Sequence, residues 1–281
     1  MLRFVPLLFA GALFGSTADF ERARQLYNRT DYEGSLAILL ALPHKDAVAW
    51  GLIGRNHYMA GDFKKASEAY EKAVAAEPSS SAYAHGLGRA FGRRAETSSP
   101  FTAPGYATNA RKSFERAVEL DPKNLEAMND LFEYYLQAPG FLGGGFDKAT
   151  ALAARIAALD AIEGHYLQAR LAEKRKDAKT AEAQLRRAVE LAPMQVGRVI
   201  DLAKFLSKQG RHQESDQAFL AAEKIDPKSP KLLFNRAETY VRAGRNLDAA
   251  RAMLRRYLAS PLTPGDPSRA EAEKLLKEAG G

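Results

Sequence analysis

Residues 46–78, DAVAWGLIGRNHYMAGDFKKASEAYEKAVAAEP, carry the pattern that decides the fold. Counted from Ala47, positions 4, 7, 8, 20, 24, 27 and 32 hold Trp50, Ile53, Gly54, Ala66, Tyr70, Ala73 and Pro78. The first three positions share one face of a helix, and positions 20, 24 and 27 share one face of a second helix. Gly54 and Ala66 allow the two helices to approach closely, and Pro78 ends the second because proline interrupts helical hydrogen bonding.

The same spacing recurs along the rest of the chain. The predicted repeats are residues 16–46, 47–80, 81–124, 125–161, 162–195, 196–229 and 230–263. Two of them carry extra residues between their helices, in residues 95–107 and residues 138–149. Residues 266–279 predict a last, solvating helix with Asp266 or Ser268 as its N-cap, because the end of a repeat array needs a polar outer face.

This pattern resembles the tetratricopeptide-repeat family over residues 19–279. The resemblance implies an all-α solenoid of about seven antiparallel helix pairs that form a superhelix, closed by the C-terminal helix. It also implies that the protein binds other proteins or peptides in a concave groove lined by the first helix of each pair. The repeat pattern itself names no partner.

Residues 1–18 predict a cleavable signal peptide. A short basic start is followed by the apolar run Phe4–Phe14, and Ser16 and Ala18 stand where a signal peptidase cuts before Asp19. The alternatives are a buried or interfacial helix and an uncleaved inner-membrane anchor, although this run is shorter than the about 20 residues that span a bilayer. We therefore expect an exported bacterial protein, periplasmic or secreted.

Composition restricts the functional classes. The chain has no cysteine, which excludes disulfides and a lipid-anchored cysteine. The net charge is +7, and removal of residues 1–18 takes away one basic residue (Arg3) and no acid, which leaves +6. Basic and acidic residues alternate along helices as they do on solvated faces. Without a dense basic run or an aromatic–basic platform, nucleic acid is not an expected partner.

No residue pattern predicts catalysis, a cofactor or a metal site. The histidines His44, His57, His85, His165 and His212 lack the close spacing of metal ligands. Gly143–Gly145 lack the Gly-Lys-Ser/Thr of a phosphate-binding loop. A lengthened turn is the favoured interpretation of these glycines, and an anion site at the following helix is the alternative. The sequence thus predicts a protein that is not an enzyme.

Basic residues recur at position 9 of the first helices, which faces the groove in this family. They are Arg24, Arg55, Arg89, Arg170 and Lys204, and His85 stands at the groove-facing position 5. Glu133 and Glu238 interrupt the row. Because guanidinium groups bind carboxylates with two hydrogen bonds, the row predicts an acidic partner segment. The alternative is solvated charge paired with acids of neighbouring repeats.

The two insertions fall between the helices of adjacent repeats and should emerge on the same edge. Their apolar residues Phe101, Tyr106, Phe141 and Leu142 predict either a binding lip or a cap packed on itself. The sequence therefore favours a non-enzymatic scaffold of the bacterial envelope that binds a protein or peptide in its groove. The alternatives are a self-assembling structural subunit, hence a homo-oligomer, and a polyanion- or polysaccharide-binding module.

Overall fold

The computed structural model describes residues 10–281, and within this range the regular elements are helices, with no strand. The first nine residues of the predicted signal peptide lie outside the described residues. None of the helices in residues 10–281 is long and apolar enough to cross a membrane. The first helix, α1 (Ala10–Asn28), runs without a break through the predicted cleavage point before Asp19.

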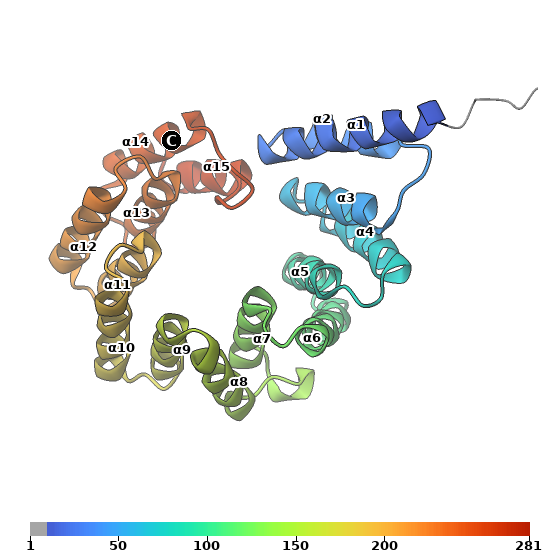
Figure 1. Ribbon diagram of the computed structural model, residues 1–281. Coiled ribbons are helices and arrows are strands. Elements are labelled where there is room, and N and C mark those ends of the chain that lie inside the picture. Colours follow the sequence, from blue (N-terminus) through green and yellow to red (C-terminus); the bar gives the residue numbers. More distant parts are fainter. Residues whose placement is uncertain (1–9) are drawn as a thin grey trace, which may run out of the picture. The chain divides into compact units, whose positions relative to one another are not determined.

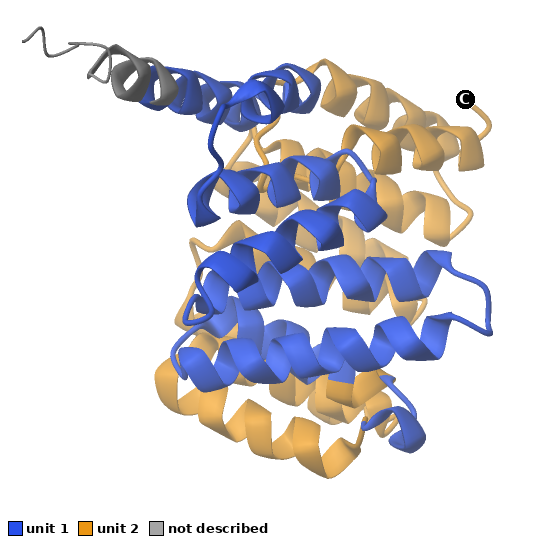
Figure 2. Cartoon of the chain, turned by 90° about the vertical axis from the view of Figure 1, so that its right-hand side faces the viewer, with its two compact units in different colours: residues 1–134, 138–143 blue, residues 135–137, 144–281 orange. Residues whose placement is uncertain are grey.

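The described chain divides into two compact units, and the boundary lies in the fourth predicted repeat (Figure 2). The first unit comprises the described residues up to Tyr134 together with Ala138–Gly143. The second comprises Tyr135–Gln137 and Gly144–Gly281. The division coincides with the insertion between the two helices of that repeat, where three successive glycines lengthen the connection.

The first unit is built from helices that pair in sequence order. The helix α1 packs on α2, α3 on α4, and α5 on α6, and α2 and α4 in turn contact α3 and α5 (Figure 1). The bounds are α2 (Tyr32–Ala41), α3 (Ala47–Met59), α4 (Phe63–Ala76), α5 (Ser81–Thr97), α6 (Ala103–Leu120) and the 3-10 helix η1 (Gly140–Leu142). The helix α7 (Leu125–Gln137) begins in the first unit and ends in the second.

The second unit continues the alternation. The helix α9 packs on α10, α11 on α12, and α13 on α14, while α15 covers the last pair. The bounds are α8 (Phe146–Leu159), α9 (Ala161–Lys174), α10 (Ala178–Leu191), α11 (Val196–Lys208), α12 (His212–Ile225), α13 (Pro230–Arg242), α14 (Leu247–Ala259) and α15 (Arg269–Glu278).

Short polar side chains fix where many of the helices begin. Side-chain oxygens accept a backbone N–H of the first turn at Asp31, Asp46, Asp62, Ser80, Asn124, Asp160, Asp177, Ser229 and Ser268. Each such bond satisfies a donor that the helix itself leaves unpaired. Ser268 forms a full capping box with Glu271, whereas Asp266 accepts hydrogen bonds from Thr263.

Two glycines show why the repeat needs a small residue at position 8. A Cβ atom added to Gly54 in α3 would lie 2.9 Å from the Tyr70 ring of α4. One added to Gly88 in α5 would lie 2.5 Å from the Phe114 ring of α6. The aromatic side chain of the second helix thus occupies the space that the glycine leaves. The close approach inferred from the sequence is present in both pairs.

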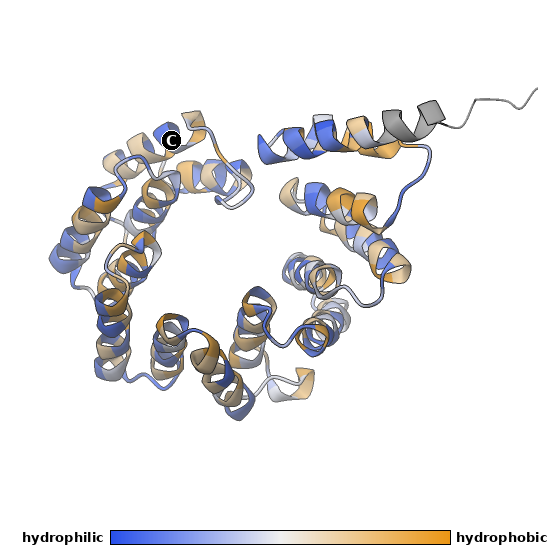
Figure 3. Ribbon diagram, in the orientation of Figure 1, coloured by the Kyte–Doolittle hydropathy of each residue, from blue (hydrophilic) through white to orange (hydrophobic). Residues whose placement is uncertain are grey.

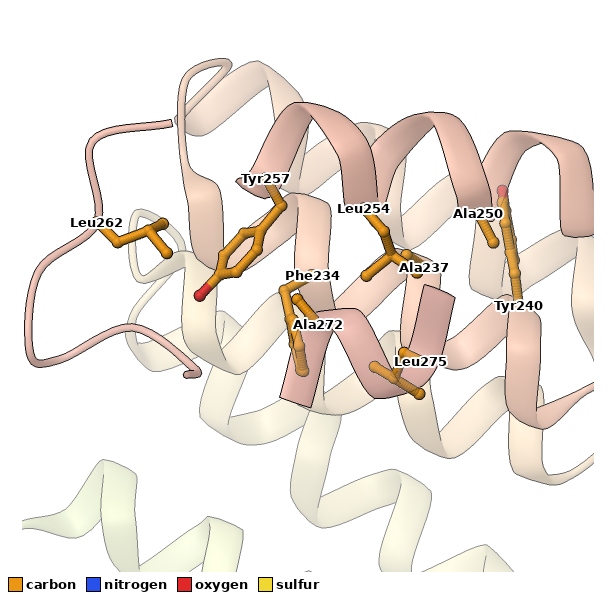
Figure 4. Close-up of a cluster of buried hydrophobic side chains, with 9 residues drawn as sticks. All are labelled: Phe234, Ala237, Tyr240, Ala250, Leu254, Tyr257, Leu262, Ala272 and Leu275. Carbon is orange, nitrogen blue, oxygen red and sulfur yellow. The ribbon is translucent and has the colours of Figure 1, made fainter. Parts of the chain in front are cut away.

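The end of the second unit has a compact core. Phe234, Tyr257 and Leu254 pack with residues of α15, including Ala272 and Leu275 (Figure 4). The Tyr257 hydroxyl donates a hydrogen bond to the carbonyl of Pro267, in the loop that leads to α15. The last helix therefore buries the open face of the final pair, as the sequence led us to expect.

Candidate functional site

An open cavity of about 710 Å³ lies in the second unit, against the first helix of each helix pair. The helices α9, α11 and α13 supply most of its wall, and α10 and α12 contribute Leu185 and His212. Tyr166 and Phe205 give the cavity apolar surface between charged side chains. A space of this size is in the range of ordinary ligand sites, which measure about 300–1,000 Å³. It can accommodate several side chains of a bound segment.

The predicted groove residues Arg170 and Lys204 both line this cavity, and both are paired. The Glu173 carboxylate accepts from Arg170 at 3.2 Å and from Lys208 at 2.9 Å. The Glu238 carboxylate lies 2.9 Å from the Lys204 ammonium nitrogen. The cationic groups here therefore already have carboxylate partners, so this face is mixed in charge instead of uniformly basic.

Asp201 of α11 is the most perturbed acid in the wall. Burial raises the pKa of its carboxyl to about 6, although Arg198 and Lys204 act in the opposite direction. The Arg198 guanidinium donates to Asp201 at 3.2 Å and also to Glu163 of α9 at 2.5 Å. The three side chains form a network that ties the first helices of adjacent repeats together beside the cavity.

In the first unit, the position-9 arginines are exposed and differ in their partners. Arg24 pairs with Glu21 at 2.6 Å on its own helix. The Arg89 guanidinium stacks over the Tyr58 ring, 4.6 Å from its centroid. No carboxylate of residues 10–281 lies within ion-pair distance of Arg55. Arg24, Arg55 and Arg89 are therefore all exposed, but they have different electrostatic surroundings.

The predicted groove residue His85 is buried. Its ring lies 5.9 Å from Phe114, and its Nε2 atom is 2.7 Å from Oδ2 of Asp130 on α7. The same carboxylate oxygen is 3.9 Å from Nε of Arg89. His85 thus holds Asp130 beside the exposed arginine, and little of its own surface is open to a ligand.

The insertion residues separate into two kinds. Phe101 and Phe141 are 96% and 83% exposed, so their rings do not pack on each other. Figure 3 shows η1, which contains Phe141, as hydrophobic. Tyr106 instead stacks on Phe91 and accepts a hydrogen bond from Arg94. The carbonyl of Leu142 accepts from the Tyr134 hydroxyl, so that backbone helps to hold the loop in place.

The glycine-rich insertion forms the expected turn. The backbone N–H of Gly143 donates to Gly140, and that of Gly145 donates to Tyr135. These two donors are used within the chain and do not face an anion. Among the described residues, no group of three His, Cys, Asp or Glu side chains could hold a metal ion.

Sequence reasoning missed the residues that set the charge of each face. Tyr27, Tyr58 and Glu173 all stand at position 12 of their repeats, three residues after the basic position 9. Residues three apart are neighbours on a helix, so this spacing was the available signal. Asp130 could not be found in this way, because it approaches Arg89 from the next repeat.

Family profiles described as "Tetratricopeptide repeat" match residues 47–80, 105–124 and 200–267. The chain is a tetratricopeptide-repeat protein. Its fold is accordingly an all-α tetratricopeptide-repeat solenoid, the architecture of a protein-interaction scaffold. No curated protein matches this tetratricopeptide-repeat protein.

Solved structures of similar fold are also described as tetratricopeptide-repeat proteins. One from Thermus thermophilus is 21% identical, covers 68% of this chain and 98% of its own, and has a TM-score of 0.55. One from Parabacteroides merdae is 13% identical, covers 95% of this chain and 100% of its own, and has a TM-score of 0.61. The C-terminal part of one from Cytophaga hutchinsonii is 15% identical, covers 92% of this chain and 99% of its own, and has a TM-score of 0.50. At these identities the likeness concerns the fold.

Proposed function

We propose that this tetratricopeptide-repeat protein is a non-enzymatic scaffold of the bacterial envelope. It holds a segment of a partner protein against the first helix of each helix pair. The observation that carries this proposal is the open cavity of about 710 Å³ in the second unit. Its wall combines aromatic surface with charged groups, which suits a polypeptide segment that has both apolar and polar side chains.

The envelope part of the proposal is supported by residues 1–18, with their basic start, apolar run and small residues before Asp19. The absence of cysteine is compatible with that location. Phe101 and Phe141 are proposed as a lip of the first unit, because each is a large apolar side chain that stands almost fully exposed on an insertion, where a partner could bury it.

Site-specific photo-crosslinking tests the proposal. A benzophenone amino acid is placed at Tyr166, in the cavity, and at Leu220, an exposed residue of α12 that does not line it. In the envelope fraction of the source cell, we expect a discrete adduct from position 166 and none from position 220. Identical adducts from both positions, or none from position 166, would reject the cavity as the binding face.

The same experiment separates self-assembly from partner binding. An adduct between two copies of this chain from position 166, together with a multiple of the 30.8 kDa mass in solution, would favour the structural-subunit alternative. Capture of a polysaccharide that is lost on adding salt would favour the polyanion alternative, because exposed charges more than a Debye length apart are screened.

A further inference from the structure

Exposed arginines and half-buried tyrosines lie three residues apart on α1 and α3 of the first unit, and α5 adds a further arginine. Arg55 and Tyr58 are three residues apart on α3, and Tyr27 occupies the equivalent place on α1. Arg89 of α5 stacks over Tyr58, with 4.6 Å between the guanidinium carbon and the ring centroid. Arg89 of the third repeat thus rests on Tyr58 of the second.

Stacking leaves the hydrogen-bonding edge of a guanidinium free. The ring covers one face of the planar group, whereas its N–H donors point outward in the plane. The nearest carboxylate to Arg89, that of Asp130, is 3.9 Å from Nε, which is longer than a hydrogen bond. The Asp130 oxygen is also held by His85 at 2.7 Å. Asp130 is therefore an ion-pair partner of Arg89 beyond hydrogen-bond distance, and a carboxylate from outside can approach this guanidinium more closely.

Arg55 is freer still. Its side chain is exposed, and no described carboxylate approaches it within ion-pair distance. Burial raises the pKa of Tyr27, while the charges of both Arg55 and Arg89 lower it. The same two arginines act on Tyr70, whose ring lies against Gly54 and Gly86. Both guanidinium groups therefore lie near the same tyrosines.

The second unit shows that this arrangement is not a general consequence of the repeat. There, position 12 of α9 is Glu173, which neutralises Arg170 at 3.2 Å and Lys208 at 2.9 Å. A new carboxylate would have to compete with Glu173 for these cations. In the first unit this position carries Tyr27 in α1 and Tyr58 in α3, and Tyr58 lies under the Arg89 guanidinium without bringing a negative charge to it.

We infer that Arg55 and Arg89, the latter stacked on Tyr58, form a carboxylate-binding site in the first unit for acidic side chains of a bound segment. The inference rests on the proposed scaffold function and adds to it the chemistry of the partner. Each arginine offers a pair of parallel N–H donors, so two carboxylates on one segment can be held together.

Binding of acetylated hexaglutamate amide to the full chain, measured by isothermal titration calorimetry, tests the inference. We expect the dissociation constant to rise at least about tenfold in the R55Q/R89Q variant, since hydrogen bonds to charged groups contribute more than neutral ones. The matched control is R186Q/R187Q, which removes the same charge from two exposed residues of α10 that do not line the cavity. We expect that control to change the constant less than about threefold.

A second variant separates the contribution of the Tyr58 ring to binding from that of the arginine charges. Tyr58→Leu keeps every charge but removes the stacking surface, so the peptide should bind several-fold more weakly, and Tyr58→Phe should restore the affinity. Equal losses in the two double variants would mean diffuse attraction by net charge. Equal binding of acetylated hexaglutamine amide would mean that carboxylates are not recognised. Either result overturns the inference.

The outcome can be told apart from that of the proposed function. If R55Q/R89Q leaves hexaglutamate binding unchanged while the adduct from position 166 persists, the carboxylate site is wrong and the scaffold proposal remains. If hexaglutamate binding depends on Arg55 and Arg89 but position 166 yields no adduct, the carboxylate site stands and the cavity is rejected. Circular dichroism of each variant confirms that the helices are retained.

Discussion

The carboxyl group of Asp201 links stability to pH. Its pKa is about 6 in the folded chain, above the ordinary value of 3.8, so the folded state binds this proton more tightly than the unfolded state. The resulting stabilisation is complete below the ordinary value and is lost as the pH rises through about 6. At neutral pH the ionised, largely buried carboxylate therefore costs folding free energy.

Replacement of Asp201 by Asn should remove this dependence. We expect the variant to match the wild type near the ordinary pKa and to exceed its unfolding free energy by at most roughly 3 kcal/mol at neutral pH. Urea denaturation across this pH range measures the difference. A wild-type curve that gains stability relative to Asp201→Asn between these values would contradict the assignment of a raised pKa.

The repeat position of an arginine does not specify its charge environment. Arg55, Arg89 and Arg170 were all found from position 9, because the repeat fixes which face of the helix that position occupies. Whether each arginine is stacked or paired depends on position 12 and on side chains of the next helix, such as Asp130 and Lys208. Those contacts arise from packing between repeats, which the spacing within one repeat does not specify.

At the scale of elements, the turn between the two helices of a pair requires a left-handed residue. Gly210 and Gly244 adopt φ of 76° and 63° in the turns after α11 and α13, and Lys176 adopts φ of 61° at the equivalent place after α9. A residue with a Cβ atom is strained in this conformation by about 1–2 kcal/mol. Lys176 is therefore a weak point of the second unit.

We expect Lys176→Gly to stabilise the protein by about 0.5–1 kcal/mol, because relief of strain exceeds the added entropy of the unfolded chain. The reverse change, Gly210→Lys, should destabilise by a comparable amount. Denaturant midpoints at constant slope give both values. Destabilisation by Lys176→Gly would show that the lysine side chain contributes more than its backbone conformation costs.

The insertions should affect binding without affecting stability. Phe101→Ser with Phe141→Ser removes two exposed rings, so the unfolding free energy should change by less than about 0.5 kcal/mol for each. If these rings form a lip, the yield of the partner adduct should fall. Met194→Ser is the control, since Met194 is exposed in a turn of the second unit. An equal fall with the control would remove the lip from the proposal.

The helices and their order could be predicted because the repeat spacing is regular, and residue type narrowed the cap of the last helix to Asp266 or Ser268, of which the structure uses Ser268. The interruption in the fourth repeat could not be predicted. The sequence shows that three glycines lengthen the connection there, but not that the compact units separate at that place. Division depends on how many contacts cross the connection, which is a property of the folded chain.

At the scale of the whole molecule, the N-terminus of the mature chain can be measured directly. If residues 1–18 are removed on export, the protein isolated from the envelope should begin at Asp19. The residues lost include the first part of α1, so the remaining helix would start beside α2. Intact-mass spectrometry of the native protein decides the matter. A protein that retains Met1 and is found in the cytosolic fraction would contradict the envelope location.

The chain has a single tryptophan, Trp50, and it lies in α3 of the first unit, where the Lys72 ammonium sits 4.1 Å from its ring centroid. Its fluorescence emission therefore reports on the first unit alone, whereas far-ultraviolet circular dichroism reports on the helices of both. If the two signals change at the same urea concentration, the units unfold together. If the emission shifts before half of the ellipticity is lost, the first unit melts first, and the glycine-rich connection marks a break in cooperativity.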